Sequence, residues 1–187
     1  MHPDVIDLPD DSGSILRGNL LLLLGAAVLL LVFYQGLALY PRLPDRIPTH
    51  FGLTGEPDAW SAKIPLTAFG TLIVAAGLLL LMAFVSSPWL SPRFYNFPGK
   101  EHLLDLRTDQ QRFALQPLRE GLAWLGSGVT IGLSFLTRDT WAVALGQRPA
   151  ISNALLLVPM AIGFAAITIG IIHTRRRLDS LTRALVE

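Results

Sequence analysis

The amino-acid sequence predicts an all-α integral membrane protein with four transmembrane helices. Of its 187 residues, 51% are hydrophobic and only 16% are charged, whereas a soluble domain carries about a quarter charged residues. Four apolar stretches reach roughly the 20 residues that span a bilayer. Between these spans the sequence predicts an ordered, irregular loop after the first helix and an interfacial helix before the third.

The four predicted spans carry almost no charge. They comprise residues 19–39, 64–85, 118–136 and 154–172, and their charged side chains are Arg119 and Glu120, at the entrance of the third span. Ion pumps generally bury ionisable groups near the middle of the membrane, so this pattern argues against a pump. The tail before the first span is acidic, unlike the basic start of a secretory signal, and we expect the span to be retained.

These spans divide the chain into five parts. The parts are an N-terminal cytoplasmic tail (1–18), a signature domain (19–85) that includes the loop 41–63, a cytoplasmic loop with an amphipathic helix (86–117), the third and fourth helices (118–172), and a basic cytoplasmic tail (173–187).

Lysine and arginine residues indicate the orientation, because cytoplasmic segments carry an excess of them. The two tails and residues 86–117, counted with Arg119, hold ten, and the other two loops hold five. We therefore predict a cell-membrane protein, such as one of the bacterial inner membrane, with both termini in the cytoplasm and the loop 41–63 outside. The net charge of +1 gives no reason to expect nucleic acid as a partner, and the absence of Cys excludes cysteine-based metal sites.

Local signals predict where the helices begin. Ser61 is expected to cap the second helix. Thr108 and Gln111 fit a capping box, in which each side chain satisfies a backbone N–H, and this would start the interfacial helix. Pro117 is expected to kink or restart the chain as it enters the membrane, because proline removes a helical hydrogen bond.

The third predicted span carries small and hydroxylated residues at helical spacing. Gly128 and Gly132 form a GxxxG pair, which lets two helices approach closely in lipid. Packing within the chain is favoured over a dimer face, which would make the protein a homo-oligomer. Ser127, Thr130 and Ser134 are interpreted as polar contacts between helices.

The loop 41–63 reads PRLPDRIPTHFGLTGEPDAWSAK and is the most informative segment of the chain. Its dense Pro and Gly argue against both a helix and an ordinary strand. We expect an irregular backbone held in one shape by Pro44, Pro48, Gly55 and Pro57, with a turn at Thr54–Gly55. The side chains that it presents are His50, Phe51, Glu56, Asp58, Trp60 and Lys63.

Four interpretations of the presented loop residues remain open. A metal site would use His50 with Asp58, Glu56 or Asp45, but catalytic zinc usually takes two or three nitrogen ligands. A general acid–base pair of His50 and Asp58 would lack an obvious nucleophile. The favoured interpretation is that both residues hydrogen-bond the loop backbone, followed by recognition of a partner through Phe51 and Trp60. We therefore predict no catalytic residue, no metal and no cofactor.

The same loop resembles the signature of a bacterial membrane family called domain of unknown function 1648. The family pattern is close to Leu-Pro-x-x-Ile-Pro-x-His-Phe, followed by a Gly-x-Pro-Asp step and a Lys before the next helix. The matching residues are Leu43, Pro44, Ile47, Pro48, His50, Phe51, Gly55, Pro57, Asp58 and Lys63. The segment SPRFYNFPGKEHLLDL is similar to the continuation in four-helix members, with Asn96, Pro98, Gly99 and Lys100 as the shared core.

The resemblance implies a multi-pass membrane protein and one class of activity. The domain also occurs in immunity proteins of the Sdp type, which protect a cell against a secreted peptide toxin. We therefore expect a non-enzymatic binding, sensing or immunity-like module whose external loop recognises a peptide or an envelope protein. The alternatives are a structural or accessory subunit of a membrane complex that docks through Gly128 and Gly132, and a membrane enzyme that uses His50 and Asp58.

Overall fold

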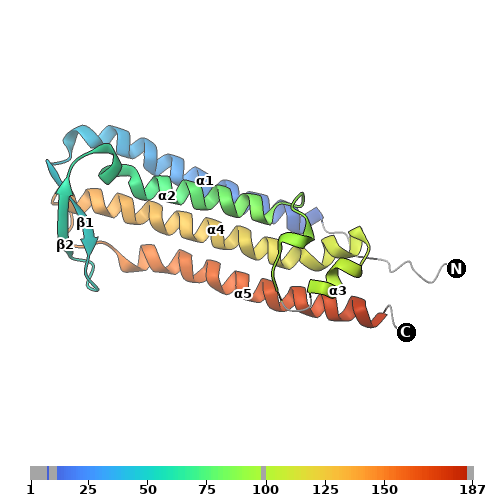
Figure 1. Ribbon diagram of the computed structural model, residues 1–187. Helices are drawn as coiled ribbons and strands as arrows, with labels where there is room; N and C mark the ends of the chain where they lie inside the picture. Colours follow the sequence, from blue (N-terminus) through green and yellow to red (C-terminus); the bar gives the residue numbers. More distant parts are fainter. Residues whose placement is uncertain (1–7, 9–11, 98–99, 185–187) are drawn as a thin grey trace.

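The computed structural model describes residues 8, 12–97 and 100–184. Four long helices run side by side, and a small β-hairpin covers one end of the bundle (Figure 1). The chain order is α1 (Ser12–Leu39), β1 (Arg46–Phe51), β2 (Pro57–Ala62), α2 (Pro65–Ser86), α3 (Lys100–Asp105), α4 (Thr108–Ala144) and α5 (Asn153–Ala184). The connection between α2 and α4 lies at the opposite end from the hairpin, beside the start of α1 and the end of α5 (Figure 1).

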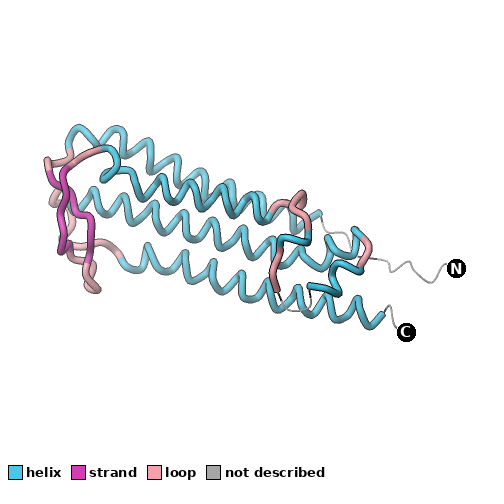
Figure 2. Tube along the Cα trace, viewed as in Figure 1, coloured by secondary structure: helices cyan, strands magenta, loops and turns pink. Residues whose placement is uncertain are grey.

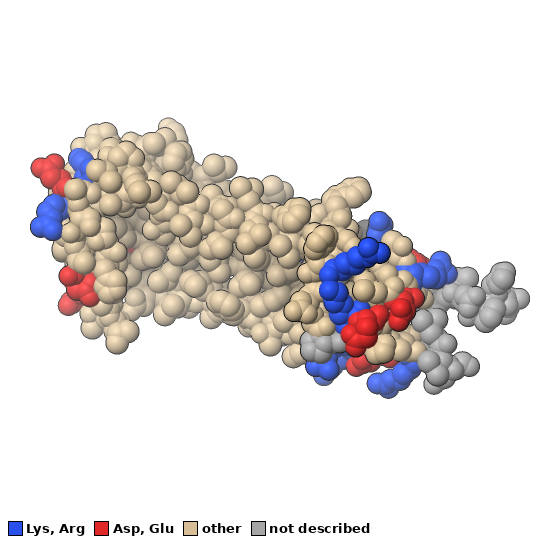
Figure 3. Space-filling view, in the orientation of Figure 1, with Lys and Arg blue, Asp and Glu red and all other residues tan. Residues whose placement is uncertain are grey.

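Three helices are long and apolar enough to cross a membrane. They are Gly13–Arg42, Pro65–Ser86 and Asn153–Ala184. On the face shown in Figure 3, charged side chains gather at the two ends of the bundle and the surface between them is uncharged. These observations indicate a multi-pass membrane protein, as the sequence predicts. The predicted third span, 118–136, lies in α4, which is not among the three candidates.

The helix α4 is the one that the other three long helices share. It packs against α1, α2 and α5, and the described part of its buried face is rich in Gly, Ser and Thr. These small and hydroxylated residues make α4 less apolar than the three candidate membrane helices. The other three long helices pack on α4, and small residues allow them to approach closely because large apolar side chains would hold them away.

Glycines bring α4 and α5 into backbone contact. A Cβ added at Gly132 would lie 2.6 Å from the carbonyl oxygen of Leu156. A Cβ added at Gly128 would overlap the carbonyl oxygen of Pro159. From the other side, a Cβ at Gly163 would lie 2.9 Å from the Cα of Leu125. The GxxxG pair therefore faces a helix of the same chain.

Hydroxyl groups add polar contacts from α4 to the other two helices. The Ser127 hydroxyl donates to the carbonyl oxygen of Leu21 in α1 at 2.6 Å. The Thr130 hydroxyl donates to the carbonyl oxygen of Ala75 in α2 at 3.4 Å. These two side chains connect helices as expected. The hydroxyl of Ser134 instead donates to the Thr130 carbonyl of its own helix.

The helix α4 continues through Pro117, so the predicted restart there is wrong. Proline cannot donate to the carbonyl of Phe113, four residues earlier, but that oxygen accepts a hydrogen bond from Nη1 of Arg177 at 2.7 Å. The next N–H, of Leu118, donates to the hydroxyl of Thr174 at 3.1 Å. Because α5 supplies both partners, the interfacial helix and the third predicted helix form one continuous element.

The other local signals are displaced by a few residues. The second helix begins after Ile64, whose N–H donates to the hydroxyl of Thr67, so the cap predicted at Ser61 is wrong. The capping box involves Arg107 and Gln110, each one residue before the predicted position. The side chain of Gln111 donates instead to the carbonyl oxygen of Leu106.

Two predicted parts differ in extent. The helix α1 begins at Ser12, inside the predicted N-terminal tail, and α5 continues to Ala184, so the predicted C-terminal tail is largely helical. Pro98 and Gly99 of the second resemblance segment lie outside the described residues.

We expect Gly128→Leu to lower the midpoint of thermal unfolding by several degrees in detergent solution, because overpacking costs about 1–3 kcal/mol. Gly77→Leu is the matched control, since a Cβ at Gly77 meets nothing within 4 Å. Equal midpoints for the two variants would contradict the close contact between α4 and α5.

Candidate functional site

The loop predicted to be irregular is a β-hairpin. The strands β1 and β2, magenta in Figure 2, pair antiparallel. Arg46 lies opposite Ala62, and the register shifts on both sides of His50. The prediction against strands was wrong because it treated every proline as a strand breaker. Proline is tolerated on edge strands, and a two-stranded sheet consists only of edges, so Pro48 and Pro57 both fit.

The tip of the hairpin is tied to the connection between α4 and α5. A turn closes where the N–H of Gly55 donates to the carbonyl of Gly52 at 2.9 Å, and Gly55 has a φ of +82°. The predicted turn at Thr54–Gly55 is confirmed. The carbonyl of Gly55 accepts from the N–H of Ile151 at 2.9 Å, and the amide of Asn153 donates to the carbonyl of Leu53 at 3.0 Å.

One buried carboxylate organises that connection. The side chain of Asp139, 4% exposed, accepts hydrogen bonds from Arg148 at 2.5 Å and from the backbone N–H of Ser152 at 2.7 Å. This holds the segment 145–152 against the end of α4, where it receives the hairpin tip. Sequence reasoning missed Asp139, although an acidic residue next to a long apolar run, with an arginine in the following loop, is a usable signal.

The inner side of the hairpin is part of the hydrophobic core. Ile47 is fully buried, and it shares a cluster with Leu43, Leu72 and Trp141. The indole N–H of Trp141 donates to the carbonyl of Ala68 in α2 at 3.0 Å. The signature residues Leu43, Ile47 and Pro48 therefore anchor the hairpin, since all three are buried.

Lys63 also has an anchoring role at the base of the hairpin. Its Nζ donates to the carbonyl of Leu43 at 2.7 Å and lies 5.6 Å from the centre of the Tyr40 ring. This cation thus joins the end of the hairpin to the segment that follows α1. Pro44, close to the same carbonyl, is exposed and makes no such contact.

The outer side of the hairpin presents polar and aromatic groups. Nδ1 of His50 on β1 lies 2.5 Å from Oδ1 of Asp58 on β2, with side-chain exposures of 70% and 53%. These residues were expected to bond the loop backbone, but they bond each other across the strands. Trp60 is 39% exposed, and Leu53 at the tip is fully exposed. Phe51 is half-buried at the end of β1.

The outer edge of β2 pairs with no other described strand, although the carbonyl oxygens of Trp60 and Ala62 accept hydrogen bonds from Nη2 of Arg46 at 2.9 Å and from the hydroxyl of Thr67 at 2.7 Å. The strand pairs with β1 along one side, none of its six residues is buried, and the described helices pack mainly against β1. An unpaired strand edge exposes backbone N–H and C=O groups to any chain that can lie beside it.

Across residues 8, 12–97 and 100–184, no group of three or more His, Asp or Glu side chains could hold a metal ion. The hydroxyls nearest in sequence, those of Thr49 and Ser61, lie 3.3 Å apart and contact each other.

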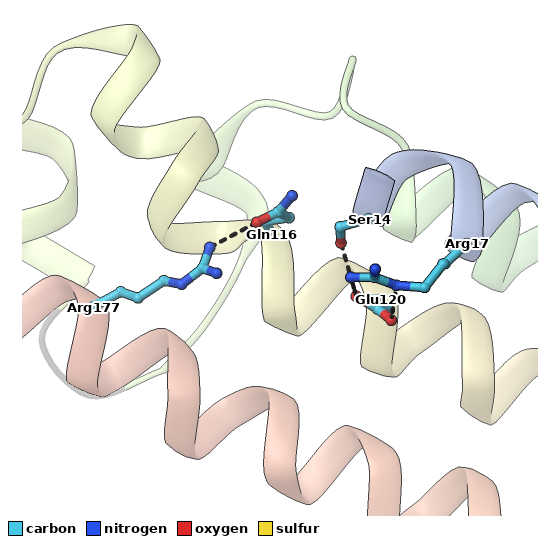
Figure 4. A network of polar contacts seen from close by, with 5 residues as sticks. All are labelled: Ser14, Arg17, Gln116, Glu120 and Arg177. Atoms are coloured by element: carbon cyan, nitrogen blue, oxygen red, sulfur yellow. Dashed lines mark hydrogen bonds and ion pairs between the residues drawn. The ribbon is translucent and has the colours of Figure 1, made fainter. Parts of the chain in front are cut away.

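Sequence reasoning missed a polar cluster at the opposite end of the bundle (Figure 4). The carboxylate of Glu120 in α4 accepts from the Ser14 hydroxyl at 2.7 Å and from Nε of Arg17 at 3.1 Å, both in α1. Nearby, Nη1 of Arg177 in α5 donates to Oε1 of Gln116 at 2.7 Å. The signal was present, because Glu120 is a charged residue at the entrance of a predicted span.

Comparison with known proteins places the signature domain in a family. Residues 21–76 match the family described as Domain of unknown function (DUF1648). The match covers most of α1, the hairpin and the first half of α2, so the resemblance inferred from the loop is confirmed. It gives no activity, because the family description assigns none.

A relative and the solved structures add little about activity. An uncharacterised protein of Archaeoglobus fulgidus is 32% identical over 95 residues, which cover 49% of each chain. The chain thus spans about half the length of this curated relative. No solved structure matches the chain.

We expect Gly55→Ala to disturb the docked tip more than Gly146→Ala. Both glycines have positive φ, +82° and +69°, so both variants incur the roughly 1–2 kcal/mol of a left-handed residue. Only at Gly55 would the new Cβ meet another segment, the carbonyl oxygen of Ile151 at 2.7 Å. Hydrogen exchange followed by mass spectrometry should show faster exchange at Ile151 in Gly55→Ala alone. Identical exchange in the two variants would mean that the tip is not docked.

Proposed function

We propose that this protein is a non-enzymatic, multi-pass membrane protein that binds an extracytoplasmic peptide or envelope protein through its hairpin. The observation that carries the proposal is the combination of a firmly anchored β1 with an uncovered β2. A binding surface gains affinity when it is ordered before the ligand arrives, and the buried Ile47 and the docked Gly55 provide that order.

The proposed binding mode is the addition of a peptide strand to the outer edge of β2. Extended peptides add to exposed sheet edges through main-chain hydrogen bonds, with neighbouring side chains giving specificity. Trp60 lies on this strand and is partly exposed, and tryptophan is among the residues that most often dominate binding energy. Asp58 and His50 supply a polar rim beside it.

The exposure of His50 and Asp58 also favours a role in binding a partner over a role in stabilising the fold. Contacts between exposed polar or charged side chains contribute about 0–1 kcal/mol to folding, so the His50–Asp58 contact adds little to stability and both side chains are accessible to a partner. A catalytic use of the pair has less support, because both side chains are more than half exposed and binding sites for small substrates are usually concave and largely apolar.

In the proposed topology α4 is a fourth membrane crossing. It runs the length of the bundle between three apolar helices (Figure 1), and its neighbours would shield its small and hydroxylated residues from lipid. The two-to-one excess of Lys and Arg in the two predicted tails and in residues 86–117, counted with Arg119, supports a cytoplasmic position for that end. The hairpin then faces outward.

Immunity to a peptide toxin, or sensing of one, is the physiological setting that we propose. The resemblance of the loop to the domain that also occurs in Sdp-type immunity proteins supports it, as does the proposed strand-addition mode, since the external partner would be a peptide. The second candidate, an accessory subunit that docks through the GxxxG pair, has less support because α5 occupies that face of α4.

Panning a random-peptide phage library against the protein in nanodiscs tests the binding mode. We expect enriched peptides whose affinity falls at least tenfold with Trp60→Ala, since interfacial tryptophans often contribute more than about 1.4 kcal/mol. Trp89→Ala is the matched control, because Trp89 is 90% exposed at the opposite end. Unchanged unfolding midpoints would show that both variants are folded. If no enriched peptide distinguishes the two variants, the hairpin is not the binding site.

A further inference from the structure

A large cavity lies at the end of the bundle opposite the hairpin. It has a volume of about 1020 Å³ and is enclosed by α1, α2 with the segment that follows it, and α4. Small-molecule sites in proteins typically occupy about 300–1,000 Å³, so this one is large enough for more than a small polar metabolite. The proposed function of the hairpin does not use it.

The cavity crosses the boundary of the apolar region. Along its α2 wall it runs from Ala83, inside the candidate span Pro65–Ser86, to Trp89 beyond the end of that span. Trp89 is 90% exposed, and tryptophan is enriched at the level of lipid headgroups. A ligand in the cavity would therefore contact both the hydrocarbon edge and the headgroup layer.

The walls of the cavity become more polar from the centre of the bundle toward the membrane surface. Leu22 and Ala83 line the part nearer the centre of the bundle, whereas Thr108, Asp109 and Arg112 line the part formed by the first turns of α4. This gradient matches an amphiphile, with its apolar portion toward the middle of the membrane and its polar portion toward the surface.

The charges of the lining favour an anionic headgroup. Its two carboxylates are already paired, Glu120 with Arg17 at 3.1 Å and Asp109 with Arg107 at 3.4 Å. The lining residues Arg112 and Arg119 form no ion pair within the part of the chain that the structure describes. The lining therefore includes two arginines that are not in an ion pair with a described carboxylate, and guanidinium binds phosphate with favourable geometry.

The two arginines differ in how they are held. Arg119 donates to the hydroxyl of Tyr95 and to the carbonyl of Leu90, both at 3.2 Å, so its position is fixed before a ligand binds. Arg112 is exposed at the rim and can be changed without removing a contact that supports the fold.

We propose that this cavity binds one anionic phospholipid, with its phosphate at Arg112 and Arg119 and its glycerol and upper acyl chains against Leu22 and Ala83. Basic pockets between membrane helices bind anionic lipid headgroups in this way. The bound lipid would fill the space between α1, α2 and α4 and connect the three helices at the membrane surface.

Native mass spectrometry of the detergent-purified protein tests this. The protein is offered an equimolar mixture of phosphatidylglycerol and phosphatidylcholine with identical acyl chains. We expect one phosphatidylglycerol molecule to be retained in preference to phosphatidylcholine, and Arg112→Gln to reduce that preference about five-fold, as expected for one arginine near an anionic surface. Ala83→Phe, which fills the apolar part, should reduce retention of both lipids.

Arg176→Gln is the matched control, because Arg176 is exposed near the same end but does not line the cavity. An equal effect of Arg112→Gln and Arg176→Gln would overturn the proposal in favour of general attraction to the surface. Equal retention of the two lipids would also overturn it. Glycerol 1-phosphate is added in a final arm, and displacement of the lipid at equal concentration would mean that the site recognises free phosphate esters instead.

Discussion

The close contact between α4 and α5 is the constraint on which the rest of the structure depends. In lipid, apolar surface gives little net attraction between helices, so association relies on close packing and hydrogen bonds. Gly128 and Gly132 allow backbone contact with α5. That contact places Arg177 and Thr174 beside Pro117, where they bond the backbone groups that the proline leaves without helical partners. The helix can therefore run unbroken from one end of the bundle to the other, and α1 and α2 pack on its remaining faces.

Because α4 is continuous, it contributes residues to the contacts at both ends of the bundle. At one end Asp139 holds the connection that receives the hairpin tip, and Trp141 joins the hairpin core to α2. At the other end Glu120 binds α1, and the first turns of α4 line the large cavity. The candidate peptide-binding surface and the candidate lipid site thus both depend on residues of the same helix.

Hydropathy and the signature residues predicted the membrane class, the family domain and the turn at Thr54–Gly55, because these depend on local composition and backbone preferences. The strands were not predicted by the same reasoning, since the sequence does not show that they form a two-stranded sheet, in which proline is tolerated because both strands are edges. Continuity through Pro117 was hidden for a related reason, because its partners are about 60 residues away in sequence. The cavity arises from three helices together, so no single segment indicates it. The contact between His50 and Asp58 was one of the open interpretations but not the favoured one, because the cross-strand geometry depends on the register of the hairpin.

We propose that the hairpin and the α2–α4 connection lie on opposite sides of the membrane, with the hairpin outside. The absence of native cysteine allows a direct measurement. Thr54 at the hairpin tip and Thr108 at the start of α4 are both exposed, and each is replaced singly by Cys and treated in intact cells with a membrane-impermeant maleimide. The account predicts that Thr54→Cys is labelled and that Thr108→Cys is labelled only after the cells are permeabilised. Labelling of Thr108→Cys alone in intact cells would contradict it and would direct the search for a partner to the cytoplasm.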